Sequence, residues 1–191
     1  MTLKDLINDN LTDKQSLHSY LPVYEHFFKN RKENVKNVLE IGVKKGGSIK
    51  LWYDYFSNAT IYGIDNNYDE FIVQDIKDEL IENERVKLLI CKDAYNVDIA
   101  ASLYGTKFDF MLDDGPHTLE SMISFIKLYI HLLSDDGVLM IEDVQSIEWI
   151  HTLIESVPNE LKQYIQFFDL RGIKGKYDDI VFVIDKSRKL F

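Results

Sequence analysis

The chain has 191 residues, of which 46% are hydrophobic, and its formal net charge at pH 7 is −10. This length can bury one substantial core and is short for two, so we expect a single domain. The 22 basic residues are scattered apart from short groups at 29–36 and 186–189, so nucleic acid is a poor candidate partner. No apolar run approaches the roughly 20 residues of a membrane span, which excludes a membrane partner of that kind.

The N-terminal residues and the cysteine content point to a reducing compartment. The first ten residues carry acids where a signal peptide has a basic region and a hydrophobic run, so secretion by that route is not expected. Cys91 is the only cysteine, which excludes an internal disulfide and a thiolate metal cluster. We therefore expect a cytoplasmic protein in which any metal ion is bound by oxygen or nitrogen.

Residues 1–36 form the first predicted element. Leu17, Tyr20, Tyr24 and Phe28 recur at helical spacing, together with Phe27, and this spacing predicts one or two helices. These helices would cover the start of a sheet as part of the same domain, or would form a lid over a pocket.

Residues 37–191 alternate short apolar runs with longer segments of helical spacing. This alternation is typical of an α/β fold in which helices cover both faces of a mostly parallel sheet. The predicted strands are Asn37 to Ile41, Thr60 to Asp65, Val86 to Cys91, Phe108 to Asp113, Gly137 to Glu142, Tyr164 to Asp169 and Asp179 to Asp185.

Two connections in this region define the predicted topology. Between the fourth and fifth strands, apolar residues recur at three- and four-residue steps from Leu119 to Leu133, which predicts a helix of about four turns packed on the sheet. Between the last two strands, Leu170 to Asp178 contains Gly172 and Gly175 and has no helical period. We therefore expect a seven-stranded sheet whose last strand is antiparallel.

The carboxyl end of the first predicted strand carries an acid and several glycines. In open α/β sheets ligands bind outside the carboxyl ends of the strands. Gly42, Gly46 and Gly47 permit close backbone approach, and Ser48 opens a helix with free amide donors that suit a carboxylate. The spacing is not Gly-x-Gly-x-x-Gly and Glu40 would repel a pyrophosphate, so a dinucleotide is disfavoured. Glu40 instead suits a cationic amino group.

Acids also end the second and third predicted strands. Asp65 could accept both hydroxyls of a ribose, and Asp93 could accept a hydrogen bond from an adenine amine. Amino acid, ribose and adenine together describe S-adenosylmethionine. Alternatively Asp93 is a solvated loop residue, Glu40 is a strand-end charge and the glycines only form turns.

The fourth and fifth predicted strands end in paired acids, Asp113-Asp114 and Glu142-Asp143. Four carboxylates at neighbouring strand ends repel one another unless a cation or protons neutralise them, and oxygen ligands favour Mg²⁺ or Mn²⁺. Helix capping could explain one acid in each pair but not both. His117 follows Asp114 by three residues and has the chemistry of a general base, although a lone histidine can also be structural. His18 could reach over a pocket or only solvate a helix.

These motifs resemble those of class I S-adenosylmethionine-dependent methyltransferases, and more narrowly those of the metal-dependent macrolide-sugar O-methyltransferases. The resemblance covers about Leu17 to Asp185 and implies a Rossmann-like class I methyltransferase fold. Its first motif is Leu39-Glu40-Ile41-Gly42-Val43 through Gly46-Gly47-Ser48, and its second is Asp113 to His117 followed by Glu142-Asp143.

The resemblance also implies roles for these residues. It implies metal binding by Asp114, Glu142 and Asp143, with His117 as the base. The residues assigned to the cofactor are Glu40, Gly42, Gly46, Ser48, Asp65, Asp93 and Asp113.

The implied activity is O-methylation of a glycan or a glycosylated small molecule, with S-adenosylmethionine and Mg²⁺ or Mn²⁺ as cofactors and possible homo-oligomerisation. Pro116 stands where the family has serine, which changes a turn residue and no ligand. The family's larger N-terminal region is not matched by residues 1–36, so substrate identity and oligomeric contacts do not transfer. The alternatives are a catechol O-methyltransferase, which uses a lysine base, a non-catalytic cofactor-binding partner in glycan assembly, and, less favoured, a nicotinamide oxidoreductase.

Overall fold

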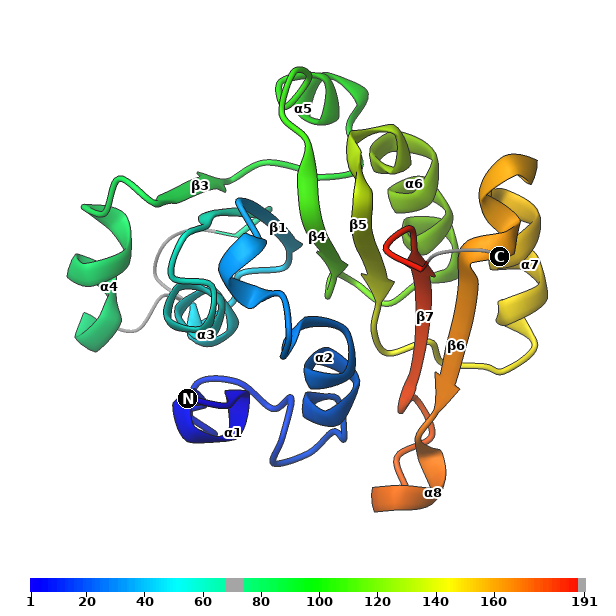
Figure 1. Ribbon diagram of the computed structural model, residues 1–191, viewed down its shortest axis with the longest axis horizontal. Helices are drawn as coiled ribbons and strands as arrows, with labels where there is room; N and C mark the ends of the chain where they lie inside the picture. Colours follow the sequence, from blue (N-terminus) through cyan, green and yellow to red (C-terminus); the bar gives the residue numbers. More distant parts are fainter. Residues whose placement is uncertain (68–73, 189–191) are drawn as a thin grey trace. The chain divides into compact units, whose positions relative to one another are not determined.

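A computed structural model describes residues 1–67 and 74–188 of the chain (Figure 1). It contains two compact units, Met1–Ala94 and Tyr95–Phe191. The predicted division into a helical segment 1–36 and a domain 37–191 stays a prediction, and residues 68–73 and 189–191 of that domain lie outside the described part. No helix of the described residues has the length and apolar character needed to cross a membrane.

Within its described residues, 1–67 and 74–94, the first unit contains short helices and three parallel strands. Its elements are α1 (Leu3–Leu6), α2 (Leu21–Phe28), η1 (Lys32–Asn34), β1 (Asn37–Ile41), α3 (Gly47–Tyr55), β2 (Thr60–Asp65), α4 (Gln74–Ile81) and β3 (Val86–Ile90). β2 pairs in parallel with both β1 and β3, with Ile41 opposite Ile64 and Asp65 opposite Ile90. The carboxyl ends of these three strands therefore lie at one edge.

Aromatic side chains anchor the N-terminal helices of the first unit. Tyr24 of α2 meets Trp52 of α3 edge to face, with ring centroids 4.9 Å apart, and Phe28 meets Phe56 in the same way at 5.2 Å. All four are essentially buried, so α2 contributes side chains to the core of the first unit. The helix begins at Leu21 rather than near Leu17, which is about half exposed.

The second unit carries four strands. Its elements are α5 (Val97–Ala101), β4 (Phe108–Asp113), α6 (Leu119–Tyr129), η3 (Ile130–Leu132), β5 (Leu133–Ile141), α7 (Trp149–Ser156), η4 (Asn159–Tyr164), β6 (Ile165–Asp169), α8 (Arg171–Lys174) and β7 (Ile180–Asp185). β4 and β5 are parallel, whereas β7 lies between β5 and β6 and is antiparallel to both.

The strand order of the seven-stranded sheet is β3-β2-β1-β4-β5-β7-β6. The predicted α/β fold with a mostly parallel sheet and an antiparallel last strand is therefore confirmed.

Thr118 caps α6, because its Oγ1 accepts a hydrogen bond from the backbone N–H of Ser121 at 3.1 Å.

The start of β5 and the segment between the last two strands differ clearly from the prediction, whereas the other strand boundaries of the second unit differ by at most one residue. β5 begins at Leu133 rather than Gly137, because Leu133 pairs with Phe108 while the polar residues that follow it keep an extended backbone. Leu133 is thus the first residue of a strand and not the last of a helical stripe. The segment predicted to lack a helix contains α8, a single turn that ends at Gly175 with a φ of 72°.

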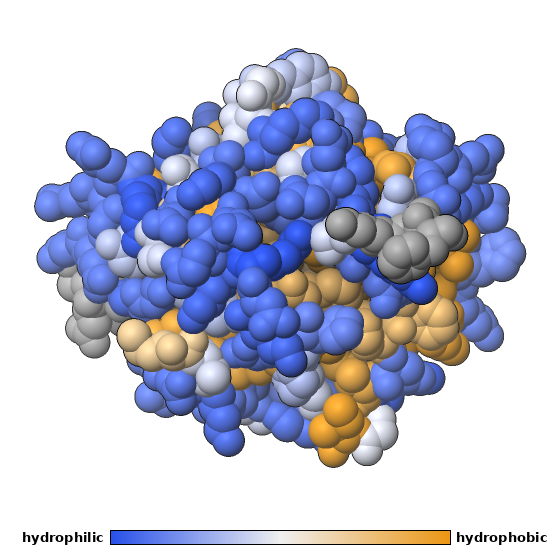
Figure 2. All heavy atoms as spheres, in the orientation of Figure 1, coloured by the Kyte–Doolittle hydropathy of each residue, from blue (hydrophilic) through white to orange (hydrophobic). Residues whose placement is uncertain are grey.

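The surface around α8 carries exposed apolar side chains. Apolar atoms stand out at the lower edge of the face in Figure 2, where Figure 1 draws α8. Ile173 and Tyr177 are each about two-thirds exposed. This short element therefore adds little to the core.

Candidate functional site

The loop between β1 and α3 is the first candidate site, and Asp65 holds its shape. Asp65 Oδ2 accepts hydrogen bonds from the backbone N–H groups of Val43 and Lys44, both at 2.8 Å, and Oδ1 accepts one from Asn67 at 2.8 Å. A carboxylate offers about four acceptor positions, so about one remains for a ligand hydroxyl. Asp65 therefore orders the loop in addition to any contact with a ribose.

Glycines in this loop meet steric demands. Gly42 and Gly46 have φ values of 92° and 81°, in the left-handed region that favours glycine, and Gly46 caps α3. A Cβ on Gly47 would lie 2.5 Å from the carbonyl carbon and oxygen of Leu11. The N-terminal segment therefore packs directly on the first turn of α3, where Ser48 is almost fully buried.

Glu40 lies in β1 just before this loop and is completely buried. Its Oε2 accepts a hydrogen bond from the indole Nε1–H of Trp52 at 3.1 Å, and its Oε1 lies 3.6 Å from the Nζ of Lys14. The sequence pattern left open whether Lys14 reaches over a pocket or is solvated, and it named no partner for this lysine. Glu40 is therefore an internal anion that already has a cation beside it.

Two other residues of the first unit were singled out from the sequence. Asp93 follows β3 and is exposed. His18 is nearly buried, and its ring stacks on Tyr20 with centroids 4.9 Å apart. The cofactor set assigned from the sequence thus lies at the carboxyl ends of β1, β2 and β3, with the exception of Asp113.

Asp113 ends β4 in the second unit and is nearly fully buried. Tyr95 donates a hydrogen bond to its Oδ1 at 2.6 Å. Burial raises the pKa of the Asp113 carboxyl to about 7, the hydrogen bond from Tyr95 opposes this shift, and the charge of Asp114 adds to it. A Cβ on Gly115 would collide with the Tyr95 hydroxyl, so the turn after Asp113 needs glycine.

Asp114, His117 and Asp143 come together at the ends of β4 and β5. His117 Nε2 lies 3.8 Å from Asp114 Oδ1 and 3.6 Å from Asp143 Oδ2. Each residue offers a ligand atom within 4.8 Å of the others, and the three side chains are between 13% and 31% exposed. They are therefore close enough to share a cation and open enough to meet a ligand.

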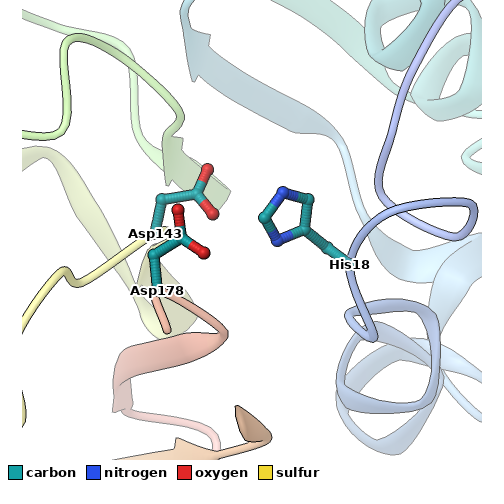
Figure 3. Close-up of side chains that lie close together, drawn as sticks. All are labelled: His18, Asp143 and Asp178. Carbon is teal, nitrogen blue, oxygen red and sulfur yellow. The ribbon is translucent and has the colours of Figure 1, made fainter. Parts of the chain in front are cut away.

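Asp178 is a carboxylate that sequence reasoning did not include. Figure 3 shows it beside Asp143, and the two offer ligand atoms within 4.8 Å of one another. β7 runs antiparallel to β5, so the residues before β7 lie at the edge where β5 ends, and Val144 N–H bonds to the Ile180 carbonyl at 3.2 Å. The acidic pair Asp178-Asp179 before a reversed strand was the signal available in the sequence.

Glu142 was predicted to join this ligand set. It is almost fully buried, and its backbone N–H donates to the Asp113 carbonyl at 3.1 Å. Among the described residues, two groups of side chains offer metal-ligand atoms within 4.8 Å of one another, and the Glu142 carboxylate is in neither group. The structure therefore brings together Asp114, Asp143 and His117 but does not place Glu142 with them.

The side chains that meet at this edge fit a hard divalent cation. Mg²⁺ and Mn²⁺ prefer oxygen ligands, and two oxygens bound to one Mg²⁺ lie roughly 3–4 Å apart. The carboxylates of Asp114 and Asp143 need only small movements to satisfy this geometry. Without a cation these carboxylates would repel each other.

Known proteins similar to this chain include O-methyltransferases. The mycinamicin VI 2''-O-methyltransferase of Micromonospora griseorubida is 31% identical over 70% of this chain and 33% of its own length. The demethylmacrocin O-methyltransferase of Streptomyces fradiae is 31% identical over 77% of this chain and 37% of its own length. The chain thus spans about a third of the length of these relatives. No family model matches it.

The fold is also shared with a solved methyltransferase. The structure of the MycE methyltransferase of the mycinamycin biosynthetic pathway, in complex with Mg and SAH, superposes with a TM-score of 0.73. The match covers 97% of this chain and 55% of that protein, at 20% identity. Sequence and fold together confirm that this chain resembles the class I S-adenosylmethionine-dependent methyltransferases and, within that class, O-methyltransferases of the mycinamicin type.

Proposed function

We propose that this chain belongs to an S-adenosylmethionine-dependent, divalent-metal-dependent O-methyltransferase that acts on a hydroxyl of a sugar or sugar-containing small molecule. The observation that carries this proposal is the convergence of Asp114, His117 and Asp143. The curated relatives named above are O-methyltransferases, which supports the reaction type.

The proposed metal ligands are Asp114, Glu142 and Asp143. Asp114 and Asp143 lie together, and Glu142 requires a change of side-chain position to join them. A divalent cation held there supplies Lewis-acid stabilisation of the negative charge that develops on a hydroxyl oxygen. The same carboxylates, once neutralised, position the acceptor.

His117 is the proposed general base. Its Nε2 lies 3.8 Å from Asp114 and 3.6 Å from Asp143, so the ring stands beside the proposed cation ligands, within reach of a hydroxyl held there. The ring is about two-thirds buried, which limits access of bulk water to this nitrogen. His117 therefore holds the proton that leaves the hydroxyl.

The loop after β1 is the proposed cofactor cradle. Glu40 would bind the cationic amino group, Asp65 a ribose hydroxyl, and Gly42, Gly46 and Ser48 would allow close backbone approach. Asp93, at the end of β3, is the proposed partner of the adenine amine. Asp113 completes the proposed cofactor set. The cofactor supplies an electrophilic methyl group, and the protein's task is to hold and orient it.

The proposal is tested with the full chain and a panel of acceptors. Methyl transfer from S-adenosylmethionine to macrolides that carry free sugar hydroxyls, to simple rhamnosides and to catechols is measured by mass spectrometry, with Mg²⁺ and with a chelator. We expect methylated sugar with Mg²⁺ and loss of product with the chelator. Methylation of catechols alone would favour an aromatic O-methyltransferase. Cofactor binding without any product would favour a non-catalytic partner.

A further inference from the structure

The first unit contains a buried ion pair between Lys14 and Glu40. The function proposed above gives Glu40 a role in cofactor binding but gives Lys14 none. The Lys14 side chain is 1% exposed and that of Glu40 is 0% exposed. Removing two charges from water is costly, so such a pair is retained only where geometry or function compensates. The lysine is therefore a candidate for a role beyond packing.

The backbone around Lys14 fixes the position of this lysine. The N–H groups of Leu17 and His18 donate to the Asp13 carbonyl at 3.1 and 3.0 Å, and the N–H of Tyr20 donates to the Lys14 carbonyl at 3.2 Å. The segment is also in direct contact with the cradle, because Leu11 packs on Gly47. Lys14 is thus built into the proposed cofactor cradle.

The two charges of the ion pair lie farther apart than in a short hydrogen bond. The Nζ to Oε1 distance of 3.6 Å is longer than the roughly 2.7–2.9 Å of a charge-assisted hydrogen bond. On the same segment, the Oγ of Ser19 is buried and makes no hydrogen bond to any residue within 1–67 or 74–188. An anionic group would find both an ammonium and a hydroxyl donor on this segment.

We propose that Lys14 and Glu40 together form the receptor for the zwitterionic amino-acid end of the cofactor. Glu40 takes the ammonium and Lys14 takes the carboxylate, so that four charges alternate in sign and sum to zero. Burying a ligand carboxylate without a cation beside it would cost free energy. In the proposed arrangement the contact between Lys14 and Glu40 is replaced by contacts of each residue with the opposite charge of the ligand. This inference rests on the proposed function for the identity of the cofactor and adds Lys14 to the residues that bind it.

Calorimetric binding to the full chain tests the inference with two ligands that differ in one group. S-adenosylhomocysteine carries the carboxylate, and its decarboxylated analogue lacks it. We expect Lys14→Met to weaken S-adenosylhomocysteine binding by roughly 10- to 100-fold, the range of one hydrogen bond between charged groups, and to change binding of the analogue by less than about 2-fold. Lys50→Met is the matched control, because Lys50 lies on α3 and pairs with Asp54 at 2.6 Å on the helix surface.

Two results would overturn the inference. An equal loss for both ligands would make Lys14 a structural residue, and tighter binding of S-adenosylhomocysteine would make it a plug that the cofactor must displace. Failure of the wild-type chain to bind S-adenosylhomocysteine would instead remove the proposed function itself, and this inference with it.

Lys14→Met leaves the charge of Glu40 buried without its cation, which could unfold the protein. A second variant therefore keeps the inference testable. The double substitution Lys14→Met with Glu40→Gln removes both charges. We expect it to bind 5′-methylthioadenosine, which has no amino-acid end, as the wild type does, and to bind S-adenosylhomocysteine no more tightly than that. A retained preference for S-adenosylhomocysteine would contradict the inference.

Discussion

The Nε2 atom of His117 lies 3.6 Å from Oδ2 of Asp143, and both residues have a backbone in the left-handed region, with φ values of 55° and 53°. Such conformations cost about 1–3 kcal/mol each for residues other than glycine. The two loops therefore hold this imidazole beside this carboxylate at the expense of local strain. Strained residues of this kind cluster at functional sites, which agrees with the role proposed for the pair.

His117→Ala is expected to lower kcat by roughly 100-fold or more, because it removes the group that accepts the hydroxyl proton. Affinity for S-adenosylhomocysteine should stay nearly unchanged. Steady-state kinetics and calorimetry measure the two effects. His151→Ala is the matched control, since His151 is exposed on α7. Equal turnover in the His117 variant would refute the base assignment.

Asp143→Asn is expected to weaken Mn²⁺ binding by at least about 10-fold, because an amide oxygen lacks the charge that a hard cation favours. Electron paramagnetic resonance of Mn²⁺ measures the free ion directly. Asp135→Asn serves as the control, since Asp135 is fully exposed and pairs only loosely with Lys186 at 3.5 Å. Unchanged Mn²⁺ affinity in the Asp143 variant would place the cation elsewhere.

Asp178→Asn tests whether the carboxylate before β7 supports the same cation as Asp143. We expect roughly 10-fold weaker Mn²⁺ binding, as is typical for residues that orient a ligand or its water. The fold should be unaffected, because the backbone hydrogen bonds at Ile180 do not involve this side chain. If only the Asp143 variant loses affinity, Asp178 is a turn residue.

Asp113 should make the stability of the metal-free protein depend on pH. The pKa of its carboxyl is about 7 in the folded protein, against the ordinary value of 3.8 that applies to the unfolded chain. Between these two pH values the folded state therefore binds more protons than the unfolded state. This contribution is fully present below about pH 3.8 and is lost as the pH rises through about 7. Urea denaturation of wild type and Asp113→Asn in a chelator, at pH 5 and pH 8, measures it. A stability difference between the two proteins that is the same at both pH values would contradict the assignment.

Gly47→Ala is expected to reduce the free energy of unfolding by about 1–3 kcal/mol, because its Cβ would overlap the backbone of Leu11. Gly172→Ala is the control, since a Cβ there meets nothing within 4 Å. Thermal or urea denaturation compares them. Similar free energies of unfolding for the two variants would mean that the N-terminal segment moves away from the added methyl group without loss of stability.

The amino-acid sequence alone determined most of the sheet. β1, β2 and β4 begin and end where the hydropathy pattern placed them, because each is a short apolar run bounded by polar residues. The pattern misplaced the start of β5, since Leu133 pairs with Phe108 and the polar residues 134–136 that follow lie at a shift in the register between β4 and β5, where burial does not mark the strand. Local hydropathy cannot detect such pairing.

For the candidate site, the sequence determined which acids and which histidine follow the strand ends, because a parallel sheet brings those ends to one edge. Only the tertiary structure decided that Asp178 lies beside Asp143, that Lys14 lies beside Glu40, and that Glu142 stands outside the cluster. Asp178 is far from Asp143 in the chain, and Lys14 is far from Glu40. Their proximity depends on strand reversal, loop packing and side-chain direction, which arise only when the whole chain folds.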